Sequence, residues 1–138
     1  MTTYERLTPT DHQLAALSQG APDEPIMMVS LLRFRARAAY PRDFDGPKDD
    51  ITGSEAFERF NEIARERIRT FGGQVIWGVP VFMTIVGPPN ERWDEILVTS
   101  FPSRQSFLDL QTDAEYEGAL VHWTAALAEC RIFACRRG

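Results

Sequence analysis

Residues 26–34 (IMMVSLLRF) form a nearly continuous apolar run that begins directly after Pro25. An apolar run of this length after a proline turn is typical of a buried central strand. Successive side chains of a strand point to opposite faces, so one face is expected to carry Met27, Val29, Leu31 and Arg33. The other face is expected to carry Met28, Ser30, Leu32 and Phe34. Because both faces are largely apolar, this strand is predicted to need cover on both sides.

The segment before this strand is predicted to be an extension of the main domain. Thr10 and Gln13 stand at the start of an apolar stretch with the spacing of a capping box, which indicates a short helix that stops at Gly20. We therefore divide the chain into an N-terminal extension, residues 1–25, and one domain, residues 26–138.

A long connection and a helix follow the first strand. The connection, residues 37–53, holds four aspartates. Loops of this length are often functional, and a solvated insertion explains it equally well. Ser54 is then expected to open an amphipathic helix that ends at Gly72-Gly73. Its apolar stripe is Phe57, Phe60, Ala64, Ile68 and Phe71.

The remaining apolar runs complete the pattern. Three more strands are predicted, at residues 74–80, 95–101 and 131–136. The run at residues 81–86 is predicted to continue the strand before it or to pair with it. Ser103 is expected to cap one helix and Asp113 another. The second of these helices has a core stripe of Tyr116, Leu120, Trp123 and Leu127.

The predicted order is a helix followed by β-α-β-β-α-β. This order predicts an α+β, ferredoxin-like domain with a four-stranded antiparallel sheet and helices on one face. The second sheet face is apolar as well, and a large exposed apolar face is costly. A second copy of the chain is the most economical cover, so we expect a homodimer.

Five segments carry a family resemblance: residues 29–35 (VSLLRFR), 71–75 (FGGQV), 93–96 (WDEI), 101–107 (FPSRQSF) and 113–127. Over residues 26–136 the chain resembles the domain-of-unknown-function family 1330, of the dimeric α/β-barrel superfamily. The resemblance implies a ferredoxin-like fold and a dimer whose two sheets close one barrel. Relatives by fold include cofactor-free monooxygenases, polyketide cyclases, lactone isomerases and haem enzymes, so the fold does not choose a reaction.

Two positions depart from the family pattern. Ser30 stands where the family has asparagine, and Trp123 stands where it has arginine after His122. Both changes remove a strong polar group at or near the expected cavity.

Composition excludes several classes of function. The net charge is −5 and the pI is about 5.0, which argues against a duplex-binding surface. We expect no membrane partner, because no window approaches the roughly 18 apolar residues of a membrane span. Cys130 and Cys135 are predicted to lie too far apart along a strand for a disulfide. With no signal peptide visible, we expect a cytoplasmic protein.

Two polar side chains are the catalytic candidates. His122 can act as a general base, or it can be a helix histidine bonded to a structural partner. Arg33 can clamp a carboxylate or an enolate, or it can form a salt bridge at the end of its strand. Asp94 can orient either of them, although a structural role after the preceding turn is the simpler interpretation.

Other residues are candidates for binding a ligand. Trp77 and Met83, with Phe82 and Met28, can line an apolar cavity for an aromatic molecule, or they can be ordinary core. Ser30 is interpreted as a small residue that admits space, since no acid or base accompanies it as a nucleophile would need.

No cofactor is expected. Two histidines cannot form a three-histidine zinc site in one chain, and no motif accompanies His122 as a haem ligand. No glycine-rich phosphate loop follows a strand. Two functions from different classes remain open. One is a cofactor-independent oxygenase, cyclase or isomerase that acts on a small apolar or aromatic acid. The other is a non-catalytic, ligand-binding or stress-related homodimer.

Overall fold

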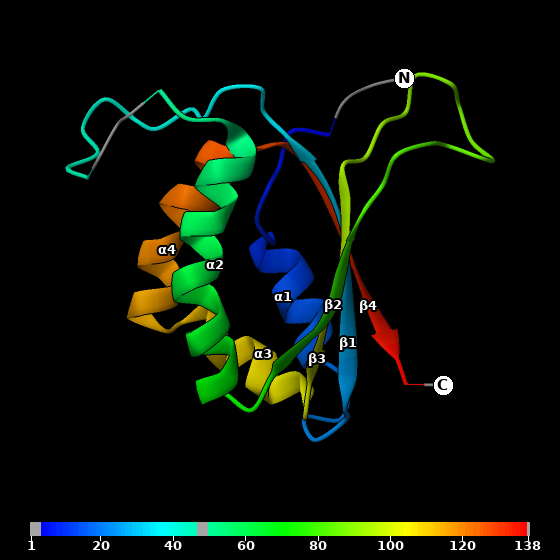
Figure 1. Cartoon of the computed structure of the whole chain (residues 1–138). Coiled ribbons are helices and arrows are strands. Elements are labelled where there is room, and N and C mark those ends of the chain that lie inside the picture. Colours follow the sequence, from blue (N-terminus) through cyan, green and yellow to red (C-terminus); the bar gives the residue numbers. More distant parts are fainter. Residues whose placement is uncertain (1–3, 47–49, 138) are drawn as a thin grey trace.

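The sheet is the centre of the structure, a computed structural model that describes residues 4–46 and 50–137. Its antiparallel strands are β1 (Ile26–Phe34), β2 (Gln74–Pro80), β3 (Glu95–Phe101) and β4 (Leu127–Arg136). They lie in the order β2-β3-β1-β4. This order confirms the predicted ferredoxin-like α+β fold, with the apolar run at residues 26–34 as a central strand (Figure 1).

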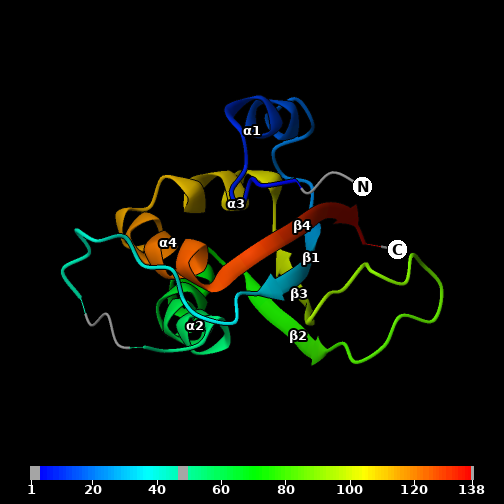
Figure 2. The same ribbon diagram turned by 90° about the horizontal axis from the view of Figure 1, so that it is seen from above.

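The helices lie on one side of the sheet (Figures 1 and 2). They are α1 (Asp11–Ser18), α2 (Gly53–Thr70), α3 (Arg104–Gln111) and α4 (Ala114–Ala126). The predicted caps of α1, α3 and α4 are confirmed, because each cap side chain accepts a backbone N–H. For α2 the cap is Thr52, which forms a capping box with Glu55, so this helix begins slightly before Ser54.

The main core lies between β1, β4 and the α2–α4 pair. Leu32 of β1 and Leu127 of β4 are fully buried there, beside Phe57 and Phe60 of α2. Trp123 of α4 completes this core, and its ring lies 5.0 Å from that of Phe60. The helix pair is joined further by an ion pair of 2.7 Å between Arg67 and Asp113.

Trp123 also holds the N-terminal extension. Its indole Nε1–H donates a hydrogen bond of 2.7 Å to the carbonyl of Leu7. At the other end of the extension, Arg104 of α3 donates to the carbonyl of Leu17 and to Glu24. Trp123 is therefore a core residue that anchors the segment before β1.

One predicted strand is wrong. Residues 81–94, which we call the arm, connect β2 to β3 without forming a strand and extend beyond the sheet (Figures 1 and 2). The register explains the difference, because β3 begins at Glu95 and pairs with β2 only as far as Pro80. The apolar run at residues 81–86 therefore has no partner strand among the described residues. The Gly87-Pro88-Pro89 turn then returns the chain toward β3.

Candidate functional site

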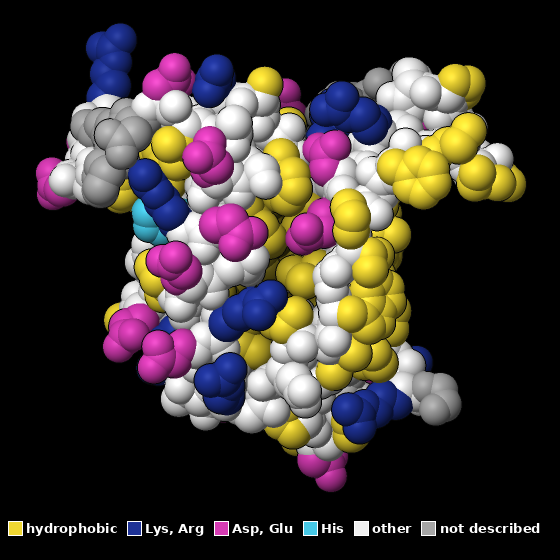
Figure 3. Space-filling model, in the orientation of Figure 1, with side chains coloured by type: hydrophobic (Ala, Val, Ile, Leu, Met, Phe, Trp, Pro, Cys, Tyr) yellow, Lys and Arg dark blue, Asp and Glu magenta, His cyan; other side chains and the backbone are white. Residues whose placement is uncertain are grey.

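No helix or strand among the described residues covers the face of the sheet opposite the helices, and we call it the open face. By strand alternation and register it carries Met27, Val29, Leu31, Arg33, Trp77, Val79, Ile96, Val98, Glu129, Arg131 and Phe133. Trp77 is 45% exposed and Phe133 is 52% exposed. Hydrophobic side chains are visible along this side of the molecule in Figure 3. The sheet therefore presents an apolar surface with a small polar group at one end.

The arm adds more exposed apolar surface beside this face. Phe82 is 96% exposed and Val86 is 95% exposed, and Met83 and Ile85 are exposed as well. In Figure 3 the hydrophobic side chains of the arm stand clear of the rest of the molecule. Large apolar side chains gathered in this way mark an interaction surface or a ligand site rather than ordinary surface.

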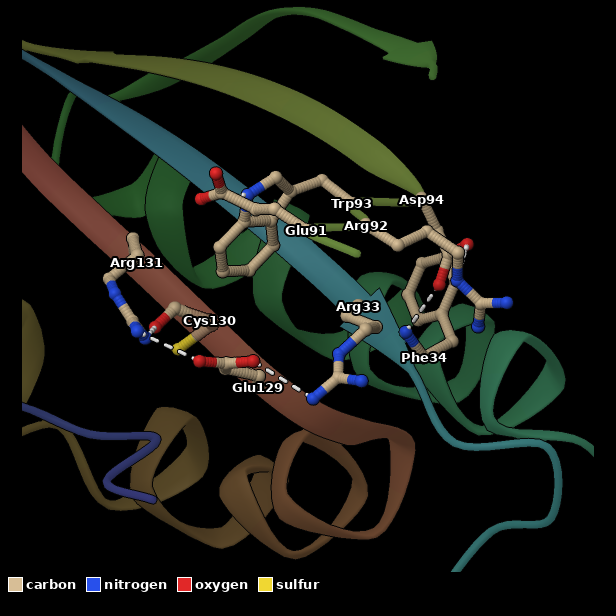
Figure 4. Close-up of polar contacts among 9 residues, drawn as sticks. All are labelled: Arg33, Phe34, Glu91, Arg92, Trp93, Asp94, Glu129, Cys130 and Arg131. Atoms are coloured by element: carbon tan, nitrogen blue, oxygen red, sulfur yellow. Dashed lines mark hydrogen bonds and ion pairs between the residues drawn. The ribbon is translucent and has the colours of Figure 1, made fainter. Parts of the chain in front are cut away.

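The polar group at the end of the open face consists of Arg33, Glu129 and Arg131, and we call it the arginine row (Figure 4). Arg33 donates from Nη2 to Oε1 of Glu129 at 2.8 Å, and Arg131 donates from Nη2 to Oε2 at 2.8 Å. The Glu129 side chain is only 14% exposed. Two guanidinium groups thus share one carboxylate, which leaves the row with a net positive charge.

Aromatic rings fix the second arginine of the row. The guanidinium carbon of Arg131 lies 5.6 Å from the ring centroid of Trp93 and 5.4 Å from that of Tyr4. Such cation–π contacts favour one orientation of the guanidinium. Arg33 does not use all its hydrogen-bond donors, because its Nε is buried and has no hydrogen-bond partner within the described part of the chain. A buried donor without a partner costs about 1–3 kcal/mol, and a bound acceptor relieves that cost.

Asp94 holds the root of the arm. Its carboxylate accepts a hydrogen bond of 2.8 Å from the backbone N–H of Phe34, and its own N–H donates to the carbonyl of Leu32 at 2.7 Å. Its carbonyl accepts from the N–H of Val81, where the arm begins. These contacts give Asp94 a structural role between β1 and the arm. Arg92 is the cation beside Asp94, with 3.8 Å between Nε of Arg92 and Oδ1 of Asp94.

His122 lies on α4, on the helical side of the molecule, beneath the long connection before α2. Its Nδ1 forms a hydrogen bond of 2.7 Å with the hydroxyl of Tyr40, and Phe44 packs edge-on against its ring. Arg59 of α2 lies against the same tyrosine. Partial burial, with a smaller contribution from the Arg59 charge, lowers the pKa of His122 below its usual value.

This lowered pKa predicts a loss of stability on acidification. The unfolded chain takes up a proton at the ordinary histidine pKa of about 6.5, and the folded chain does so only at lower pH. Acid therefore favours the unfolded state as the pH falls through about 6.5. We expect His122→Gln to flatten the dependence of unfolding free energy on pH between about 7.5 and 5.5, measured by urea unfolding. His12→Gln, at an exposed position on α1, is the matched control. If the unfolding free energy of His122→Gln depends on pH as that of the wild type does, His122 is not the group whose protonation lowers the stability.

The structure does not bring all the predicted site residues together. Arg33 and Trp77 lie on the open face, Met83 lies on the arm, and Ser30 is buried on the helix-facing side of β1. His122 lies against Tyr40 and Phe44 on the helical side, and neither His122 nor Arg33 lines the cavity beneath α1 or the cavity at the arm. Sequence reasoning missed Glu129 because the closing strand was predicted to begin at Arg131, four residues after the observed start of β4 at Leu127.

The described residues hold two thiols and no cluster of potential metal ligands. Within the described ranges no three histidine, cysteine or acidic side chains lie together as a metal site requires. Both cysteines are free thiols, as predicted, and burial raises the pKa of the Cys130 thiol to about 11. No helix in the described part of the chain is both long and apolar enough to cross a membrane.

Comparisons with known proteins identify similar structures. No family model and no curated protein matches this sequence, so membership of family 1330 stays a prediction. A dimeric protein of unknown function with a ferredoxin-like fold, from Bacteroides fragilis NCTC 9343, has a TM-score of 0.46 and 13% identity over 82% of this chain and 96% of its own. A protein of unknown function from Rhodopseudomonas palustris, RPA0582, is 28% identical with a TM-score of 0.86 over 98% of both chains. Its methylated form has a TM-score of 0.87 and 28% identity over 97% of this chain and 96% of its own. The chain is thus similar along almost its whole length, including α1, to an uncharacterised bacterial protein.

Proposed function

We propose that the protein is a homodimer that buries its open face and binds a small apolar or aromatic acid at the arginine row. The observation that carries this proposal is Arg33, whose partly exposed guanidinium shares Glu129 with Arg131 at the end of an apolar sheet face. Such a donor, next to apolar surface, suits a ligand that combines a carboxylate with a hydrocarbon or aromatic body.

A second copy of the chain is the cover that best fits the open face. The face is apolar along its centre and polar at its two ends, at the arginine row and at Gln74 and Ser100, which resembles the core-and-rim pattern of protein interfaces. The exposed side chains of the arm lie beside the same face and extend the apolar surface. A twofold dimer buries the open faces of both copies in one interface, so neither copy keeps an exposed open face.

The charge of the row supports an anionic ligand. Glu129 is shared by two guanidinium groups, so the two arginines keep several N–H donors beyond those that it accepts. A planar carboxylate can accept two parallel hydrogen bonds from one guanidinium. Arg33 is the better placed of the two arginines, since Arg131 also donates to the carbonyl of Cys130.

Removal of the Arg33 charge tests this assignment. We expect Arg33→Gln to weaken benzoate binding about tenfold, measured by isothermal titration calorimetry, because a charge-assisted hydrogen bond is lost. Binding of the neutral analogue benzamide should change little. Arg35→Gln, at the exposed position two residues further along the chain, is the matched control. Equal affinity of the wild type and Arg33→Gln for benzoate, or no benzoate binding by the wild type, sinks the assignment.

The enzymatic alternative has one observation in its favour. His122 has a lowered pKa and a hydrogen bond to Tyr40, so a neutral imidazole is available as a base near neutral pH. Its weakness is the distance between elements, because Arg33 lies on the open face and His122 lies on the helical side. An enzyme built on His122 therefore needs another cation, and Arg59 is the one beside Tyr40. We place the non-catalytic function first for this reason.

A further inference from the structure

A cavity of about 610 Å³ lies between α1 and the β4 side of the sheet. Its apolar lining comes from three directions, with Leu14 and Leu17 of α1, Met28 and Ile132 of the sheet, and Phe107 of α3. Cavities of several hundred Å³ with mostly apolar walls are typical of small-molecule sites. Arg33 and His122 do not line this space, whereas Arg131 of the arginine row and Phe133 of the open face lie at its border.

The cavity follows from the way the extension is attached. Leu7 is fixed before α1 by the indole of Trp123, and Leu17 is fixed near its end by Arg104. Between these two anchors α1 has no fully buried residue, although Leu14 and Leu17 line the space beneath it. Helix α1 is therefore held over the sheet by its ends, and its apolar side chains do not fill the gap.

The charge at the cavity is of one sign. Arg6 and Arg131 line it, and among the described residues no aspartate or glutamate does, in a chain whose net charge is −5. The charge of Arg131 is already paired with Glu129, so this side chain contributes mainly to the lining of the cavity. Arg6 is an exposed side chain of the lining, and the exposed polar side chain of Gln13 lines the cavity as well. A molecule with an apolar body and one anionic group complements this arrangement.

We propose that the space beneath α1, which we call the α1 cavity, binds a small monocarboxylate with an apolar chain. The hydrocarbon part lies against Leu14, Leu17, Met28 and Ile132, and the carboxylate lies near Arg6. Burial of the hydrocarbon supplies most of the affinity, because each buried methylene contributes about 0.8 kcal/mol. The exposed arginine contributes the preference for an anion. This site requires no second copy of the chain.

Octanoate is a suitable probe, with octan-1-ol as its uncharged counterpart. Ala134 of β4 and Ala16 of α1 both line the cavity and are exposed, so a larger side chain at either position fills the space without entering the core. We expect Ala134→Phe and Ala16→Phe each to weaken octanoate binding more than about tenfold by titration calorimetry. Ala15→Phe, at the neighbouring exposed position of α1 outside the cavity lining, is the matched control and should leave the affinity unchanged.

A second pair of variants tests the charge. We expect Arg6→Gln to weaken octanoate about threefold and to leave octan-1-ol unchanged, as the loss of an exposed ion pair predicts. Arg69→Gln, on the exposed face of α2, should alter neither. The proposal is overturned if the wild type does not bind octanoate, or if Ala134→Phe and Ala16→Phe bind it as tightly as the wild type does. It is also overturned if Arg6→Gln leaves the preference for octanoate over octan-1-ol intact. Binding that survives in the filled variants and disappears in Arg33→Gln places octanoate at the arginine row instead.

Discussion

Replacement of Phe133 with aspartate should convert the proposed homodimer into monomers. Phe133 lies on the open face and is 52% exposed in the single chain, so the monomer tolerates a polar side chain there. In the dimer the same position is buried, and each copy would bring one unpaired carboxylate into the interface. A buried charge without a partner costs several kcal/mol, so the dimer dissociation constant should rise at least about a hundredfold.

Sedimentation equilibrium of the wild type and the variant over a range of concentrations measures this effect. Ala134→Asp is the matched control, because it introduces the same charge one residue further along β4, on the helix-facing side of the strand. Circular dichroism checks that both variants remain folded. A wild-type chain that sediments as a monomer at all concentrations rejects the homodimer, and with it the explanation of the open face.

The fold could be predicted because local signals and long-range packing agree. The apolar run at residues 26–34 forms the central strand, and the stripe that begins at Phe57 is buried against it. Three of the helix caps are also the predicted residues, Thr10, Ser103 and Asp113. Each of these features depends on residues close together in sequence, where periodicity and capping give a direct signal.

The arm could not be predicted for a physical reason. Residues 81–86 have the composition of a strand, and strand composition reflects a side chain that is buried on at least one face. In the single chain the side chains of residues 82–86 are exposed, because the register of β2 and β3 ends before them. The local sequence shows that the segment is apolar. It does not show which surface the segment contacts, so composition alone predicted a strand.

The candidate site was predicted only in part for a similar reason. Arg33 was visible as a cation on an apolar strand, and its partner Glu129 lies almost a hundred residues later in the chain. The partner of His122 is Tyr40, in a connection with no periodicity that could indicate its position. The α1 cavity depends on two anchors, Trp123 with Leu7 and Arg104 with Leu17, that join distant segments. Pairings of this kind arise from the tertiary fold and leave no local pattern.

Phe57 is the residue whose truncation should cost the most stability. Its side chain is fully buried, and its ring lies 5.3 Å from that of Phe34, 5.8 Å from Phe60 and 5.9 Å from Trp123. Phe57→Ala removes the ring from the centre of the α2–α4 contact with β1 and leaves a cavity that these neighbours cannot close. We expect a loss of about 3–5 kcal/mol in unfolding free energy and a fall of more than about 10 °C in melting temperature.

Urea unfolding and differential scanning calorimetry measure the two quantities, with Phe57→Leu as the graded control. Leucine keeps most of the buried apolar volume, so its cost should stay near about 1.5 kcal/mol. The difference between the two variants isolates the cavity from the loss of aromatic contacts. A loss below about 1 kcal/mol in Phe57→Ala would show that α2 can collapse onto the sheet without this ring. In that case the aromatic cluster does not determine how the helical layer sits against β1.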